Sequence, residues 1–342
     1  MVGVTGVTLF NEEQEEITEQ IVNQPSCKSV VDKKVQALSR ADLKIIAASA
    51  QILQAKTSGS DLTFMHSIMC QIGLPRSRVD GDEFVRLCGD AGLYVSAGKI
   101  WNGKQFEKQP IPYGPLPRLL LAHLNTLALR NKSPEIDVGK SARSFLKSLG
   151  KSSTGGKKGS LTTLQKQVKA LAACSMTIGL TTESKAITYD GKPISKFEAW
   201  LPAIDQSASE DKSSWPGTVT FSHEYYTTLT KHAVPLDMRA LQALSTSALA
   251  MDVYVMLADR LHRIQGRPFV LYWSNLKEQF GHEYKGPSAL KNFKKAFKPA
   301  LNRALAVYPA AKEKVKYVTG GILLSHCNPP IEYKATPCGT DF

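Results

Sequence analysis

Lysine and arginine side chains that could bind phosphate are concentrated in two stretches of the sequence. Residues 139–182 contain eight basic residues and no carboxylate, and residues 285–316 contain nine basic residues against Glu313 alone. Together the two stretches carry a charge of +16, whereas the whole chain carries +13, so the remainder sums to −3. Charge gathered into two patches is typical of a protein that binds a polyanion through two surfaces. The alternative is that both basic stretches are solvent-exposed faces that bind no partner.

Other residues that could do chemistry lack the partners they would need. The Gly-Lys-Ser at residues 139–141 is not a phosphate-binding loop, because Pro134 stands where that motif requires glycine. None of the seven histidines forms the His-hydrophobic-His metal site of a nicking nuclease. We therefore expect structural roles for His223, Tyr225 and Tyr226, and no metal site at Asp237 or Asp252. The sequence predicts a binding protein without a cofactor, not an enzyme.

Both basic stretches fall on segments with a helical pattern. Leu164, Val168 and Leu171 recur at helical spacing within residues 161–174, and lysines occupy the opposite face. A second such helix begins near residue 288, where Phe293 and Phe297 belong to the apolar stripe. Pro299 interrupts this helix. Since proline removes a backbone hydrogen bond, we expect a kink or a restart there.

The first of these helices completes a series of elements. Helices are predicted over residues 117–131, 141–149 and 161–174, the second of them stopped by Gly150. A hairpin then follows over residues 176–202, with Asp190-Gly191 in its loop. Three helices and a β-wing make a winged helix-turn-helix.

A second series follows the polar spacer at residues 206–214. A strand at residues 217–221 leads into several helices, and strands on either side of Gly320-Gly321 close the series. These helices are predicted over residues 222–231, 245–264 and 274–280 and from residue 288. The fold class expected is therefore α+β and mainly helical, with two winged helix-turn-helix domains in tandem.

The region before these domains is mixed. It begins with a polar helix rich in glutamate, followed by helices over residues 39–56 and 64–72. A strand-like segment at residues 93–101 ends in an Asn102-Gly103 turn. Prolines between residues 110 and 117 mark its end. The predicted divisions are residues 1–109 for this region, 110–205 and 215–333 for the two domains, and 334–342 for a tail.

The third helix of a helix-turn-helix enters the major groove, and flanking cations hold phosphates. In the second domain the residues predicted to contact double-stranded DNA are Ser288, Lys291, Asn292, Lys294, Lys295, Lys298, Asn302, Arg303, Lys314 and Lys316. In the first domain they are Lys157, Lys158, Thr162, Thr163, Gln165, Lys166 and Lys169. Asn292 is suited to a bidentate bond with adenine; the alternative is that its side chain faces the protein and caps a turn. RNA or an acidic protein is the alternative ligand for a basic helix.

Composition indicates where such a protein works. The six cysteines form no Cys-x-x-Cys pair, so reduced and mostly buried thiols are expected. No apolar run reaches the ~18 residues of a membrane helix, and the first residues lack the basic segment of a secretory signal. We expect a cytoplasmic protein that makes no contact with a membrane.

Several segments resemble the plasmid-encoded RepA-type replication initiators. They include PYGPLPRLLLAHLNTLAL, SARSFLKSLG, VPLDMRALQALSTSALAMDVYVMLADRL, YWSNLKEQFG, ALKNFKKAFKPAL and NPPIEY, and the resemblance runs from about residue 64 to residue 333. It implies a protein built from two winged helices that binds repeated sites (iterons) at a plasmid origin. It also implies melting of adjacent A·T-rich DNA and recruitment of the host initiator and replicative helicase.

The resemblance further implies roles for the two basic helices and a means of association. The third helix of the second domain would read the repeat, and that of the first would contact a neighbouring groove or backbone. Similar initiators often form a homodimer through the first domain, where Leu120, Leu124 and Phe145 could supply a shared apolar surface; burial in the core is the alternative for each. A basic winged-helix transcriptional regulator without initiator activity is the alternative function. An RNA-binding module is the third, although no aromatic RNA-binding run is present.

Overall fold

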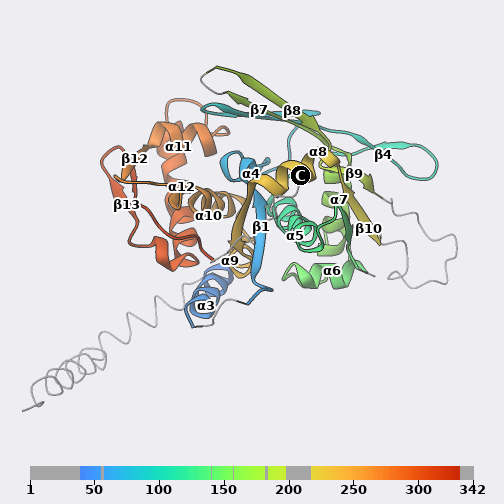
Figure 1. Ribbon diagram of the computed structural model, residues 1–342, viewed down its shortest axis with the longest axis horizontal. Helices are drawn as coiled ribbons and strands as arrows, with labels where there is room; N and C mark the ends of the chain where they lie inside the picture. The colour runs from blue at the N-terminus through green and yellow to red at the C-terminus, as the bar shows by residue number, and fades with distance from the viewer. Residues whose placement is uncertain are drawn as a thin grey trace, which may run out of the picture. The chain divides into compact units, whose positions relative to one another are not determined.

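The computed structural model describes residues 39–54, 58–139, 141–156, 158–181, 184–197 and 217–331. The chain divides into two compact units, Met1–Lys44 and Ile45–Phe342. Helix α3 (Arg40–Gln54) begins in the first unit and confirms the helix predicted over residues 39–56. The predicted glutamate-rich helix, the spacer at residues 206–214 and the tail lie outside the described residues. The elements below belong to the second unit, which mixes helices and strands (Figure 1).

A buried helix lies at the centre of this unit. Helix α10 (Ala248–Leu261) packs against α4 (Ser67–Gln71), α5 (Pro115–Asn131) and α12 (Ala289–Ala306). All of its residues except Arg260 are buried. Apolar residues occur all around this helix, and a helix of that kind has no solvent side. The helix predicted over residues 245–264 is confirmed with shorter ends, and elements from both predicted domains share one hydrophobic core.

The first series of helices is confirmed. It consists of α5, α6 (Ala142–Ser148) and α7 (Ser160–Ala173). Three short strands form an antiparallel sheet beside these helices, in the order β6 (Glu135–Asp137), β10 (Thr218–Phe221) and β9 (Ile194–Phe197).

The hairpin predicted after α7 is wrong in its loop. Strand β7 (Ser175–Thr181) pairs with β8 (Ala186–Gly191), so Asp190-Gly191 ends a strand. Thr177 lies opposite Asp190, and its hydroxyl donates a hydrogen bond to the carboxylate at 2.7 Å. This cross-strand bond gives Asp190 a partner inside the sheet, which the turn-like dipeptide does not reveal.

Strands from the first part of the chain join strands from later parts. β1 (Leu62–His66) pairs with β11 (Ala233–Asp237). β2 (Glu83–Cys88) and β3 (Ala91–Ser96) extend the sheet of β7 and β8 in the order β2-β3-β7-β8. The helix predicted over residues 64–72 is therefore wrong in its first half, because pairing with the distant β11 draws residues 62–66 into a strand.

The second series ends as expected. Helix α8 (His223–His232) is followed by β11 and by α9 (Met238–Leu244), and neither of these last two was predicted. Strands β12 (Phe269–Tyr272), β14 (Gly321–Leu324) and β13 (Val315–Val318) form an antiparallel sheet in that order. Helix α11 (Trp273–Phe280) leads to α12, and a single-turn helix, η1 (Pro309–Ala311), precedes β13. No helix in the described part of the chain is long and apolar enough to span a membrane.

Helix α12 runs through Pro299, so the helix does not restart there and the kink stays a prediction. Phe293 and Phe297 before the proline and Leu301 after it are buried in the same core. Burying each such side chain contributes about 1.5 to 3 kcal/mol, whereas proline in a helix costs about 3 kcal/mol. Packing on both sides of Pro299 therefore outweighs the lost hydrogen bond.

Candidate nucleic-acid interface

Helix α12 turns a cationic face to solvent. Its apolar side, with Phe293 and Phe297, is buried against the core, and its sequence contains no carboxylate. The exposed members of the predicted set are Ser288, Lys291, Asn292, Lys295, Lys298 and Asn302. Lys294 and Arg303 are half-buried. Ser288, Lys291, Lys295, Lys298 and Asn302 follow one another at spacings of three and four residues, which places them on one side of the helix, and Asn292 adjoins Lys291.

Two aromatic side chains hold lysines of this face in place. Tyr317 of β13 donates a hydrogen bond to Asn302 Oδ1 at 3.1 Å, and Lys298 Nζ lies 5.6 Å from the centroid of its ring. Lys294 Nζ lies 5.3 Å from the centroid of a Trp273 ring at the start of α11. Such cation–π contacts restrict long side chains. Burial raises the pKa of Tyr317, so the hydroxyl remains a donor at neutral pH.

These contacts alter the expected roles of two residues. Because Asn302 Oδ1 already accepts a bond from Tyr317, the two N–H donors of the amide and one lone pair of Oδ1 remain for DNA. Lys316 on β13 and Lys314 before it are exposed to solvent. Tyr317 and Trp273 were not in the predicted set. The aromatic residue directly after Lys316 in KVKYV was the available signal for Tyr317.

Asn292 lies in the first turns of α12. Its backbone N–H donates to Ser288 O at 2.9 Å, and its side chain is exposed to solvent. That exposure favours contact with a ligand over the alternative in which the side chain faces the protein. Contact with adenine stays a prediction.

The second basic surface begins in a compact loop before α7. Thr154 N donates to Ser160 Oγ at 2.8 Å, and Ser160 Oγ donates to Ser152 O at 2.8 Å. A Cβ at Gly159 would lie 2.3 Å from Thr154 O, so only glycine fits at this turn. Lys158 is exposed on the loop, whereas Lys157 lies outside the described residues.

On α7 itself the polar residues split between contact with the protein and exposure. Gln165 and Lys166 are exposed, and Lys169 is half-buried. Thr162 Oγ1 donates to Gly156 O at 2.8 Å, and Thr163 Oγ1 donates to Gly159 O at 2.9 Å. Both hydroxyl protons are therefore used within the loop and helix, which leaves these side chains only as acceptors.

One basic residue of the first stretch has a structural role. Lys151 Nζ donates to Ser245 Oγ at 2.6 Å, which ties the loop after α6 to the end of α9. Gly150 packs there too, with φ of 69° at the end of α6. A Cβ at this glycine would lie 2.5 Å from the Gln242 side chain. The ammonium group of Lys151 therefore helps to hold this loop in place.

The two basic helices are connected through packed helices. α7 packs on α5, α5 on α10, and α10 on α12. In Figure 1, α7 and α12 accordingly lie on either side of α5 and α10. The spacing between the two basic surfaces is thus set by the contacts of α5 with α10.

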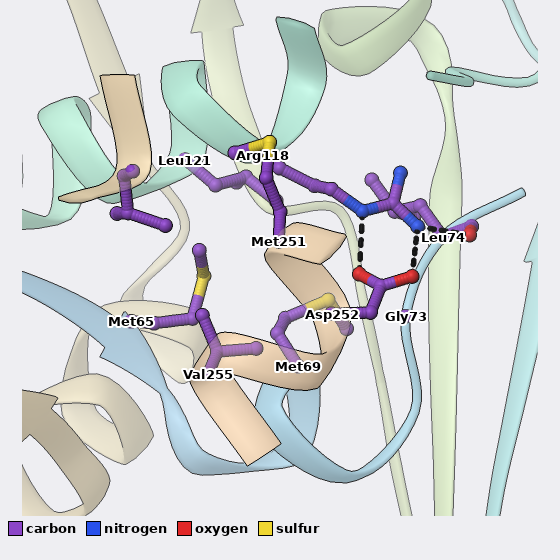
Figure 2. Close-up of a pocket in the computed structure, with 10 residues that line it drawn as sticks. Met65, Met69, Gly73, Leu74, Arg118, Leu121, Met251, Asp252 and Val255 are labelled. Carbon is purple, nitrogen blue, oxygen red and sulfur yellow. Dashed lines mark hydrogen bonds and ion pairs between the residues drawn. The ribbon is translucent and has the colours of Figure 1, made fainter. Parts of the chain in front are cut away.

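A buried ion pair joins α5 to α10 (Figure 2). Arg118 Nε and Nη2 donate to the two carboxylate oxygens of Asp252 at 2.6 and 2.8 Å. Nη2 also donates to Leu74 O at 2.6 Å, and Nη1 donates to Gly114 O at 2.7 Å. Both side chains are buried. Asp252 is therefore not a metal ligand but the anchor that holds α10, α5 and the segment after α4 together.

The other acidic and aromatic residues named from the sequence also have structural partners. Asp237 caps α9 by accepting from Arg239 N at 2.8 Å and pairs with the Arg239 guanidinium at 2.7 Å. Tyr225 Oη donates to Asn125 Oδ1 at 3.0 Å. Among the described cysteines, all four are free, and three of them are buried.

The apolar surface predicted to be shared between copies is wrong. Leu120, Leu124 and Phe145 are 1, 4 and 4% exposed and belong to the core of this unit. They pack between α5, α6 and α7, where their burial stabilises the fold of a single chain. These three side chains are not available to a second copy.

The fold defines a protein with two basic, helix-borne surfaces on one mixed core. Residues 111–274 match the family model described as plasmid encoded RepA protein, which supports the resemblance to the RepA-type replication initiators. The matched range contains α5 to α10 and ends at the start of α11, before α12.

Two further comparisons complete the findings. A crystal structure of selenomethionine derivatives of domains 2 and 3 of RctB is similar with a TM-score of 0.45 at 13% sequence identity, over 70% of this chain and 83% of that chain. No curated protein matches the chain.

Proposed function

We propose that this protein initiates plasmid replication by binding repeated sites in the double-stranded DNA of the origin. The observation that carries the proposal is the exposed face of α12, which combines three lysines with two asparagines, Asn292 and Asn302, and no carboxylate. The RepA-family segment in the same chain supports the origin as the target. Positive charge on one helix face attracts phosphate, and the amide of Asn292 can distinguish bases.

The proposed binding mode assigns a role to each part of α12. Ser288, Lys291 and Asn292 are in the first turns and reach base edges in the major groove. Lys295 and Lys298 hold phosphates, and Lys316 on β13 extends this contact as a wing. We propose that residues 215–333 act as one winged-helix domain in this way. Residues 110–205 act as the other winged-helix domain, in which the cations of α7 contact a neighbouring groove or the DNA backbone.

Origin opening and recruitment complete the proposed function. Binding at adjacent repeats would strain A·T-rich DNA next to them, and the host initiator and replicative helicase would then assemble on the complex. A homodimer held by surfaces other than Leu120, Leu124 and Phe145 belongs to the same proposal. None of these steps requires a catalytic group of this chain.

The test is protection of the plasmid DNA that adjoins the gene, together with a replication assay. We expect the purified full chain to protect several equally spaced repeats, and Lys295→Ala to weaken protection at all of them. Lys231→Ala is the matched control, because Lys231 is an exposed helical lysine of α8 outside both basic surfaces. Protection without support of origin-dependent replication would instead identify a transcriptional regulator. The absence of any protected repeat would overturn the proposal.

A further inference from the structure

Two large aromatic side chains are exposed near the tip of a hairpin. β4 (Lys99–Trp101) and β5 (Phe106–Lys108) form a two-stranded sheet within the described residues, and Trp101 lies directly opposite Phe106. Their side chains are 51 and 68% exposed, and the rings meet edge to face with centroids 5.3 Å apart. Aromatic side chains usually bury most of their surface. An exposed pair on a projecting hairpin indicates a binding role.

Cations share the face of the hairpin that carries the two rings. Lys99 and Lys108 are also directly opposite each other, two residues before Trp101 and two after Phe106. Since side chains two positions apart point to the same face of a strand, both ammonium groups follow the rings on that face. Lys108 Nζ also donates to Asp82 at 2.6 Å, in an exposed ion pair. The opposite face carries Ile100 and Glu107.

The hairpin is held in a defined conformation at both ends. At its base Gln109 N donates to Gly98 O at 2.9 Å, and a Cβ at Gly98 would lie 1.9 Å from Ala173 O. The base therefore presses against the last residue of α7. At the tip Asn102 Oδ1 accepts the N–H groups of Lys104 and Gln105 at 3.0 and 2.9 Å. The rings are thus pre-organised rather than placed on a loose loop.

We propose that this hairpin binds single-stranded DNA. Unpaired bases present open faces that stack on exposed aromatic rings, whereas the bases of a duplex stack on each other. Lys99 and Lys108 follow the rings at the spacing of the strand and meet the phosphates of the same DNA strand. The exposed cation of Lys104 adds to this attraction at the tip. The inference rests on the proposed function, because an initiator that opens an origin generates such a strand beside α7.

The experiment measures binding of the full chain to a fluorescent oligothymidylate of about 20 nucleotides. We expect Trp101→Ala and Phe106→Ala each to weaken binding about tenfold, which corresponds to ~1.4 kcal/mol and lies within the range for base stacking. Trp101→Phe keeps a stacking ring and should bind nearly as the parent chain does. Val85→Ala is the matched control, because Val85 is 57% exposed on β2 and belongs to no aromatic pair.

Stacking also has a spectroscopic signature. Tryptophan emission of the parent chain should be quenched by the oligonucleotide, and Trp101→Phe should lose that quenching while it retains affinity. Unchanged affinity of Trp101→Ala and Phe106→Ala would overturn the inference, as would a parent chain that does not bind oligothymidylate. Variants that bind the oligonucleotide normally but fail to support replication would assign the hairpin to a protein partner instead, which also overturns it.

The same preparations separate this inference from the proposed function. Duplex from the protected region, tested in parallel, should bind the hairpin variants as tightly as the parent chain. If the chain binds the duplex and the hairpin variants bind the oligonucleotide as tightly as the parent chain, the inference alone is refuted. If the chain binds the oligonucleotide through Trp101 but does not bind the origin duplex, the proposed function alone is refuted.

Discussion

The buried pair of Arg118 and Asp252 allows a sharp test of how the two basic surfaces are held together. The changes to make are Arg118→Met and Asp252→Asn, each alone and both together. Asparagine keeps the shape of the aspartate side chain, and methionine keeps much of the arginine's apolar stem. Each single change therefore leaves one buried charge without its counter-ion, while the double change removes both charges.

The structure sets the expected magnitudes. Removing one partner of a buried pair costs about 3 to 5 kcal/mol, a large share of the roughly 5 to 15 kcal/mol by which a domain is stable. Asp252→Asn falls near the lower value, because Arg118 keeps its bonds to Leu74 O and Gly114 O. Arg118→Met falls near the upper value, because it also leaves those carbonyls without this donor. The double variant should be less destabilised than the sum of the two single variants.

Urea unfolding, followed by circular dichroism, measures these free energies on the full chain. The control is Lys231→Ala, which removes an exposed charge and should change stability by less than about 0.5 kcal/mol. Losses below about 1 kcal/mol for both single variants would refute the reasoning. So would strict additivity in the double variant, since the two charges would then not interact.

Three further changes test other parts of the structure. Gly73→Ala should destabilise the fold by about 1 to 3 kcal/mol in urea unfolding, because its Cβ would lie 2.8 Å from the Asp252 carboxylate; an unchanged midpoint contradicts this. Burial, with repulsion from His232, lowers the pKa of His66 to about 4. The unfolded chain takes up that proton near pH 6.5, so stability is full above that value and falls by ~3 kcal/mol as the pH drops to 4. His66→Asn should flatten this fall in unfolding measured against pH, and an equal fall in both proteins counts against it. Asn292→Ala should cost ~1 to 3 kcal/mol on the cognate repeat and leave random DNA unaffected in a binding titration; equal losses on both remove Asn292 from base recognition.

Helices with a clear apolar stripe could be predicted from the sequence because their signal is local. The stripe of Leu164, Val168 and Leu171 places α7 within one residue of its observed bounds. The lysines on α12 could be assigned to an exposed face for the same reason. Strand β1 could not, because residues 62–66 become a strand only by pairing with β11, some 170 positions away.

Features that depend on contacts between residues far apart in the chain could not be predicted from the sequence for the same reason. Asp252 and Arg118 lie among apolar residues in their helices, and nothing local shows that they meet. The hydrogen bond of Tyr317 to Asn302 likewise requires β13 to lie against α12. Leu120, Leu124 and Phe145 had the composition of either a core or an interface. Only the packing of α7 on α5 and of α6 on α7 decides between the two.

The salt dependence of binding to an origin duplex tests the central claim most directly. If the basic surfaces neutralise about 6 to 10 phosphates, log K should fall with log[salt] at a slope of roughly −5 to −9. Lys295→Ala should reduce the steepness of that slope by about one, and Lys231→Ala should leave it unchanged. A flat salt dependence, or a slope that Lys295→Ala does not alter, would contradict DNA binding through the exposed face of α12.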